Sequence, residues 1–124
     1  AQNKADALVV IEAIRSIDTN LSIMGLAGSH MKYLVEEAGS TFIAEAFADR
    51  RYEIDGKLRS RHLPDALITN KSDACEQVLS IANALFAQTV DGDKVDIVAD
   101  SFCIHGDNPA AVEIAQMLQE QIKD

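Results

Sequence analysis

The segment His105-Gly106-Asp107-Asn108-Pro109 carries the side chains of this sequence that are best suited to acid–base chemistry. An imidazole gives or takes a proton near neutral pH, a glycine lets a ligand approach the backbone, and the free amides at the start of a helix can hold an anion. The same residues also fit an ordinary turn between a strand and a helix, with Asp107 or Asn108 as the helix cap and His105 packed in the turn. On the residues alone, both interpretations stay open.

A single carboxylate lies inside the apolar run of residues 41–47, a run that predicts a strand. Burying the side chain of Glu45 is costly unless an opposite charge meets it, so we expect a partner from the basic segment that follows. The candidates are Arg50, Arg51, Arg59 and Arg61. Glu45 would then be either a carboxylate of a functional site or half of a structural ion pair.

That basic segment, residues 49–61, lies in a chain whose net charge is -9. Its four arginines are joined by Lys57. Because an arginine fork holds a carboxylate or a phosphate through two hydrogen bonds, the segment is suited to binding an anionic group. Solvated loop charge is the competing explanation, and it is favoured for Arg51 and Lys57.

The remaining candidate groups give weaker signals. Residues 25–29 place glycines between a strand and a helix, but they match neither GxGxxG nor a P-loop, so a phosphate cradle is only weakly indicated. Cys75 and Cys103 are expected to be packed, reduced thiols. His30 and His62 have no partners at the spacing of a zinc site, so no metal site is predicted.

Helical and strand patterns alternate along the chain, which predicts a mostly parallel sheet with flanking helices in a single α/β unit spanning residues 1–124. Helices are expected at residues 4–17, 31–38, 71–88 (capped by Asn70) and from Pro109 onward, and strands at residues 21–27, 41–47, 66–69 and within 95–104. Ser29 is a candidate helix N-cap, Gly39 a helix terminator and Asp55-Gly56 a hairpin turn. Because the carboxyl ends of parallel strands meet at one edge, residues 25–29, 45–51 and 105–108 are expected to gather at a shared rim.

Length and charge narrow the class of protein. The chain has 124 residues, whereas a closed (β/α)₈ barrel takes about 250, so a complete barrel is excluded. Twenty acidic against eleven basic residues disfavour nucleic acid and anionic membranes as partners. No apolar run approaches a membrane span, and the first residues lack the order of a signal peptide, so a cytoplasmic location is expected.

Five segments taken in order carry a resemblance to a known family. They are Gly25-Leu26-Ala27-Gly28-Ser29, Glu45-Ala46-Phe47-Ala48-Asp49-Arg50-Arg51-Tyr52, residues 56–61, Ala66-Leu67-Ile68 and His105-Gly106-Asp107-Asn108-Pro109. Over almost all of its length the chain resembles the C-terminal half of the LamB/YcsF lactam-utilisation family, the family of the A subunit of the bacterial ATP-dependent 5-oxoprolinase. The resemblance implies an irregular β/α barrel of the glycoside hydrolase/deacetylase type, of which this chain would be a part.

The resemblance also implies an activity and roles for particular residues. The activity is ring opening of 5-oxoproline to glutamate, driven by ATP and carried out with the B and C subunits as partners. Arg50 or Arg61 would hold the substrate carboxylate or a phosphate, and His105 and Asp107 would move a proton or orient water, with Glu45 positioning them. The binding residues are completed by Asp49, Asn108 and Ser29. Participation of a divalent metal stays open.

Family members are about twice as long, so this chain is expected to be inactive alone and to pair with the missing N-terminal half or with itself, through an uncovered sheet face and edge. Two alternatives remain on the sequence. One is a metal-dependent hydrolase resembling carbohydrate deacetylases, and the other is a non-enzymatic domain that binds a small anion through the basic segment.

Overall fold

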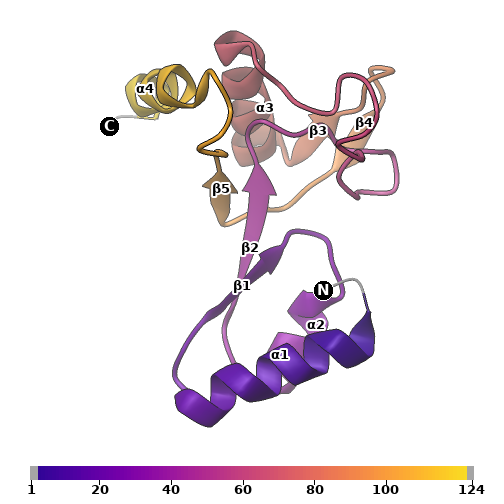
Figure 1. Ribbon diagram of the computed structural model, residues 1–124, viewed down its shortest axis with the longest axis vertical. Coiled ribbons are helices and arrows are strands. Elements are labelled where there is room, and N and C mark those ends of the chain that lie inside the picture. The colour runs from indigo at the N-terminus through magenta and orange to yellow at the C-terminus, as the bar shows by residue number, and fades with distance from the viewer. Residues whose placement is uncertain (1–2, 123–124) are drawn as a thin grey trace.

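The computed structural model describes residues 3–122, in which helices and strands alternate along most of the chain (Figure 1). The elements are α1 (Lys4–Ile17), β1 (Ile23–Leu26), α2 (Met31–Glu37), β2 (Phe42–Phe47), α3 (Lys71–Ala84), β3 (Phe86–Gln88), β4 (Lys94–Asp96), β5 (Ser101–Cys103) and α4 (Ala111–Gln121). No helix within the described residues is both long enough and apolar enough to cross a lipid bilayer.

The main sheet has the strand order β1-β2-β5, and both pairings are parallel. Its register sets Leu26 opposite Glu45 and Glu45 opposite Ser101, so all three strands end at the same edge. The predicted α/β fold, with a parallel sheet and flanking helices, is therefore confirmed. An antiparallel ribbon of β3 and β4 lies apart from this sheet and was not predicted.

The two faces of the sheet differ in how they are covered. Along β2, residues 42, 44 and 46 are buried and residues 43, 45 and 47 are only partly buried, which is the period of two expected for a strand. The buried face packs with α2 and, through Phe102, with the cluster under α3 and α4. The opposite face is open, and Met24 of β1, which pairs with Ile43, is half exposed on it.

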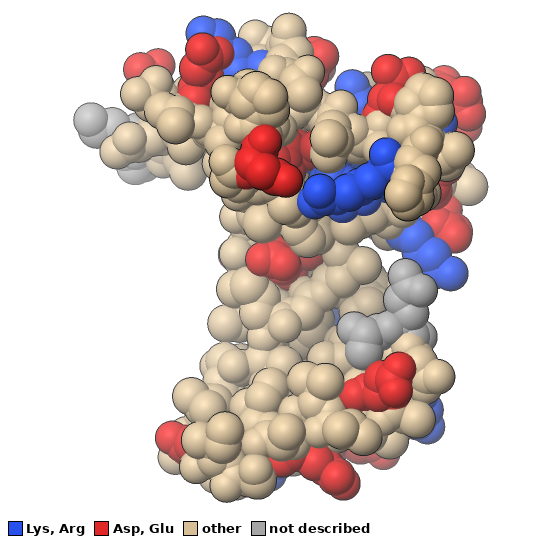
Figure 2. Space-filling model, in the orientation of Figure 1, with Lys and Arg blue, Asp and Glu red and all other residues tan. Residues whose placement is uncertain are grey.

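The molecule has a narrow middle between two wider ends, and β2 runs through the narrow part (Figures 1 and 2). The helices α1 and α2 lie at one end, and α3, α4 and the β3–β4 ribbon lie at the other. Two apolar clusters of buried residues share Phe102 at their border. The larger one runs from α1 and α2 along the sheet to Ile81 and the β3–β4 ribbon, and the smaller one joins α3 and α4 beside the end of β2.

Several local predictions are confirmed by backbone geometry. Asn70 caps α3, because its side-chain oxygen accepts a hydrogen bond from the Asp73 amide at 3.1 Å. Gly39 ends α2 with φ at +89°, a value that glycine adopts without strain. The Asp55-Gly56 turn forms as expected: Tyr52 and Leu58 pair across it, and Gly56 has φ at +86°.

Other boundaries differ from the sequence predictions. The third helix ends at Ala84 rather than at residue 88, because Leu85 turns left-handed (φ 61°) and the chain continues as β3. Ser29 is not an N-cap, since its hydroxyl donates to the Leu26 carbonyl instead. Pro109 precedes α4 by two residues, within a turn closed from the Ala111 amide to the Asn108 carbonyl. The strand expected at residues 66–69 is reduced to one bridge between Arg50 and Leu67.

Candidate functional site

A buried carboxylate and an imidazole from distant parts of the chain meet beyond the ends of β2 and β5. Asp49 follows β2 and is fully buried, while His105 follows β5 and keeps part of its side chain exposed. Asp49 Oδ1 lies 2.7 Å from His105 Nδ1, and Oδ2 accepts the backbone amide of His105 at 2.9 Å. The parallel pairing of β2 with β5 makes this contact possible, because it ends both strands at one edge.

The contact selects one form of the imidazole. A carboxylate only accepts hydrogen bonds, so Nδ1 is assigned the proton and Nε2 is left with a free lone pair. The ring of Phe47 stacks against the imidazole, with centroids 5.2 Å apart and an interplanar angle of 10°. The imidazole is thus held at its edge by the hydrogen bond to Asp49 and on its face by the ring of Phe47. Its Nε2 is the nitrogen available to act as a base.

Asn108 completes the surroundings of Asp49. Its amide nitrogen donates to Asp49 Oδ2 at 3.2 Å and to the Ile68 carbonyl at 3.0 Å, and its oxygen accepts from the Ala110 amide. Both side chains are buried, and these polar contacts are made to the protein itself. These contacts hold Asp49 and Asn108 in place, and the predicted role of both residues in binding substrate or phosphate stays a prediction.

Arg50 is almost completely buried next to this pair. Its Nη2 donates to the Arg59 carbonyl at 2.7 Å, and its Nε finds no partner within the described part of the chain. Burial, and secondarily the positive charge of Arg61, lower the pKa of the Arg50 guanidinium below its ordinary value, while Asp49 acts in the opposite direction. An anion brought to this place would relieve the repulsion between the two guanidinium groups.

The other charged residues of the segment divide into rim and scaffold. Arg61 and Asp107 are exposed and lie 3.9 Å apart, a loose pair at the edge of the site. Arg59 instead bonds Glu53 at 2.8 Å and the Pro64 carbonyl at 2.8 Å, which closes the loop on itself. In Figure 2, basic and acidic groups lie near one another on the wider end that carries α3, α4 and the β3–β4 ribbon.

Glu45 and Ser29 do not join this cluster by direct contact. Within residues 3–122, Glu45 forms no ion pair with the four arginines named as its candidate partners. Its side chain lies on the open face of the sheet, two residues before Phe47, and is only partly buried there. Ser29 lies beyond the end of β1, bonded to its own turn.

Two buried polar residues of the site, Tyr52 and Gln77, were not among the predicted site residues, although Tyr52 ends one of the segments that carry the family resemblance. The hydroxyl of Tyr52, which is fully buried, accepts the Phe47 amide at 3.0 Å. Burial is the main cause that raises the pKa of Tyr52 to about 12. Gln77 of α3 donates to the carbonyls of Phe47 and Arg50. A polar residue on the apolar side of a helix, between Ala74 and Val78, was the one hint available for Gln77.

The glycines of residues 25–29 serve the fold. A Cβ added at Gly25 would lie 2.8 Å from Cε1 of Phe42, so the missing side chain makes room for that ring. Gly28 has φ at +79° and opens the turn after β1. These observations give no support to a phosphate cradle at this position.

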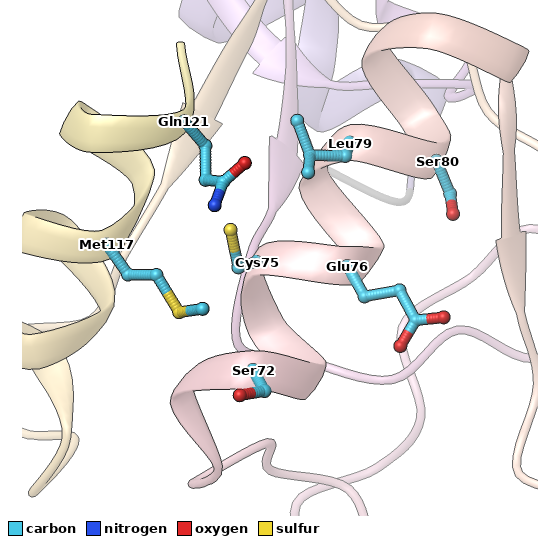
Figure 3. Close-up of a pocket in the computed structure, with 7 residues that line it drawn as sticks. All are labelled: Ser72, Cys75, Glu76, Leu79, Ser80, Met117 and Gln121. Atoms are coloured by element: carbon cyan, nitrogen blue, oxygen red, sulfur yellow. The ribbon is translucent and has the colours of Figure 1, made fainter. Parts of the chain in front are cut away.

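Both cysteines are free thiols, as predicted, and neither has the character of an activated nucleophile. Burial raises the pKa of Cys75. Burial likewise raises the pKa of Cys103, with further contributions from the negative charges of Glu45 and Asp49. Cys75 faces Met117 and Gln121 across a groove of about 370 Å³ between α3 and α4 (Figure 3). None of the residues that line this groove belongs to the Asp49–His105 cluster.

Comparison with known proteins gives one consistent result. The LamB/YcsF family model matches residues 1–124. The 5-oxoprolinase A subunit of Histophilus somni is 41% identical over 118 residues, which cover 95% of this chain and 48% of that protein. One of the 5-oxoprolinase A subunits of Pseudomonas syringae pv. tomato is 42% identical over 123 residues, or 99% of this chain and 48% of that protein.

A solved structure agrees with these relatives. The crystal structure of the lactam utilization protein from Thermus thermophilus superposes with a TM-score of 0.81 at 28% sequence identity, covering 93% of this chain and 47% of that one. The chain therefore spans about half the length of the proteins it matches. The family match over the full chain, the identity to its members and the shared fold together show that this chain belongs to the LamB/YcsF family.

Proposed function

We propose that this chain forms the C-terminal half of the A subunit of a 5-oxoprolinase, which opens the lactam ring of 5-oxoproline to give glutamate at the expense of ATP. The single observation that carries the proposal is the buried Asp49 bonded to Nδ1 of a partly exposed His105, in a chain about 40% identical to proteins of that name. Such a pair leaves a base at the surface of the site, which hydrolysis of an amide requires.

Each group of the site has a task in this reaction. Transfer of the ATP γ-phosphoryl group to the lactam oxygen releases ADP and makes the ring carbon electrophilic. Water then adds to that carbon while Nε2 of His105 takes its proton, and the adduct breaks its C–N bond, so that the nitrogen takes a proton and leaves as the amine of γ-glutamyl phosphate. A second water releases phosphate from this acyl phosphate and leaves glutamate. Asp49 and Asn108 hold the imidazole in its orientation, while Arg50 and Arg61 attract the substrate carboxylate or the phosphate.

Glu45, Asp107 and Ser29 keep smaller proposed roles. Glu45 lies on the same sheet face as Phe47, whose ring stacks on the imidazole, and its negative charge would favour a developing imidazolium. Asp107 pairs with Arg61 at the rim and sets the direction of its guanidinium. Ser29 reaches substrate only if the rest of the barrel brings the end of β1 toward the site.

ATP enters as a co-substrate. Within this chain, the arginines of the site could bind one phosphate group of ATP but not the whole nucleotide. The glycines near Ser29 are explained by packing and by a turn, so we assign its nucleotide to the partner subunits or to the N-terminal half. The relatives are named as subunits, which supports an assembly, and we propose that it contains the A, B and C subunits. Free thiols fit the reducing cytoplasm.

We also propose that the sheet is part of an irregular β/α barrel. Helices cover one face of β1, β2 and β5, and the uncovered face carries Glu45 and Phe47, as expected for the inside of a barrel. The N-terminal half, or in its absence a second copy of this chain, would cover this face and the free strand edges.

The proposal is tested in the full-length A subunit together with its partners. Replacing His105 with alanine should lower turnover of 5-oxoproline by at least about 100-fold, the usual contribution of a general base. The matched control is His62→Ala, which removes an exposed imidazole outside the site. Unchanged turnover in His105→Ala would overturn the proposal, and acetyl release from acetylated sugars by the wild type would favour a deacetylase instead.

A further inference from the structure

Gln77 lies in the middle of α3, buried to 5% exposure, and uses its side-chain nitrogen to bridge two backbone carbonyls. Nε2 is 2.7 Å from the Phe47 oxygen and 2.8 Å from the Arg50 oxygen. These carbonyls flank a short segment, residues 47–50, whose third residue is Asp49. One amide group thus ties both ends of the segment that presents the carboxylate to His105.

The orientation of this amide follows from its surroundings. Only the NH₂ end of glutamine can donate, and both neighbours are carbonyl oxygens, so a flipped amide would set three oxygens against one another. In the observed orientation Oε1 is enclosed without a partner among the described residues. An unpaired buried acceptor costs about 1–3 kcal/mol, so packing alone gives no reason for a glutamine here.

Three other backbone groups of the segment form hydrogen bonds elsewhere. The Phe47 amide donates to Tyr52, the Ala48 amide to the Cys103 carbonyl at 2.9 Å, and the Asp49 carbonyl accepts from Ile68 at 2.8 Å. The carbonyls of Phe47 and Arg50 are the two that the bridge secures. Because Phe47 stacks on the imidazole and Asp49 bonds it, a shift of this segment moves both supports of His105 together.

We propose that Gln77 is a positioning residue of the site: by bridging Phe47 and Arg50 it holds Asp49 where the carboxylate fixes the Nδ1–H form of His105. The inference rests on the proposed function for the role of His105 in turnover. The other part of the inference, that Gln77 positions Asp49 against His105, concerns only contacts within this chain and does not depend on the reaction.

The first test is magnetic resonance on the chain itself. In the wild type, the two side-chain amide protons of Gln77 should exchange slowly and show couplings across hydrogen bonds to the Phe47 and Arg50 carbonyls. Rapid exchange of these protons would overturn the proposal without any variant. Gln77→Met keeps the length and removes both donors, and it should broaden or abolish the Nδ1–H signal of His105.

Two further variants separate positioning from stability. Gln119→Met makes the same replacement on an exposed face of α4 and should leave the His105 signal unchanged. Gln77→Glu keeps the shape, and its neutral form donates one proton, so it should restore part of the signal at low pH. A Gln77→Met chain that unfolds more easily but keeps the Nδ1–H signal would assign Gln77 a merely structural role.

The kinetic test uses the full-length A subunit with its partners. Gln77→Met should lower kcat by about tenfold, because the imidazole loses its supports, and it should also raise KM, because Arg50 belongs to the segment that the bridge holds. Unchanged kcat in Gln77→Met, alongside a large loss in His105→Ala, would refute the positioning role alone. Unchanged turnover in both would refute the proposed function itself.

Discussion

Asp49 has no exposed surface, yet its carboxylate accepts three hydrogen bonds, from the His105 amide, the His105 ring and the Asn108 side chain. When the acceptor of a buried donor is removed, water cannot replace it, and the donor is left without a hydrogen bond. The same residue therefore stabilises the fold and sets the chemistry of the site. This double role distinguishes it from Asp107, which is exposed two residues after His105.

Asp49→Ala should lower the free energy of unfolding by about 3 kcal/mol, since it leaves buried donors unpaired and opens a small cavity. Urea unfolding followed by circular dichroism measures this loss. Asp107→Ala, which removes an exposed carboxylate of the same type, should change the free energy by no more than about 0.5 kcal/mol. Equal losses in the two variants would contradict the network around Asp49.

The buried hydroxyl of Tyr52 makes stability depend on alkaline pH. Its pKa is about 12 in the folded chain, against the ordinary value of 10.0 for an exposed tyrosine. Below pH 10 the phenol is neutral in both states and this contribution is fully present. Between pH 10 and about 12 only the unfolded chain loses the proton, so the free energy of unfolding falls, by about 2–3 kcal/mol in total.

Unfolding by urea at pH 9, 10, 11 and 12 tests this pH dependence. Tyr52→Phe should remove that part of the slope, whereas Tyr33→Phe, which alters an exposed ring on α2, should retain it. The chain has only these two tyrosines, so the comparison is complete. A wild-type slope that survives in Tyr52→Phe would show that other groups cause the alkaline loss.

At the scale of elements, local sequence patterns correctly predicted helices and turns. They did not predict the boundaries that depend on contacts between distant parts of the chain. The bounds of α1 agree with the apolar spacing, and the turns at Gly39 and Gly56 agree with the glycine positions. The end of α3 was wrong because the apolar spacing continues past Ala84 into a strand whose Ala87 is buried by tertiary packing. Leu85 gives no local signal of a left-handed turn.

The candidate site shows the same division. Convergence of residues 45–51 and 105–108 could be predicted, because parallel strands end at one edge. The pairing of Asp49 with His105 across 56 positions could not, nor could the bridge made by Gln77, since neither leaves a mark in local spacing. Glu45 was expected to be buried and paired, but it lies partly buried on the uncovered sheet face and forms no ion pair with the arginines of residues 49–61 within the described residues.

The turn that ends α3 is a place where the backbone is strained. Leu85 has φ at 61°, a region that costs a non-glycine residue about 1 kcal/mol, and half of its side chain is exposed, so little burial compensates. Leu85→Gly should raise the free energy of unfolding by about 0.5–1 kcal/mol in urea. Ala84→Gly, one residue earlier in the helix, should lower it by up to about 1 kcal/mol. Destabilisation by both variants would mean that the Leu85 side chain contributes more than its exposure indicates.

At the scale of the molecule, the sheet formed by the described residues 3–122 is covered on one face only, and β1 and β5 are its edge strands. Apolar groups on the open face include Met24 and Ile43, which are neighbours in the register. A free parallel edge beside an apolar face favours association with another chain. In the proposed barrel the N-terminal half would fill this place, and without it a second copy is the available partner.

We expect sedimentation velocity of this chain to show association that grows with protein concentration between about 10 and 500 μM. Met24→Lys should shift the equilibrium toward the monomer, because it places a charge on the open face next to the β1 edge. The matched control is Ile17→Lys, which adds the same charge at an exposed position at the end of α1, away from the sheet, and should leave the association unchanged. A chain that stays monomeric across the range, or one that both lysine variants weaken equally, would show that the open face is not what associates. In that case a second copy of this chain would not be what covers the open face of the sheet.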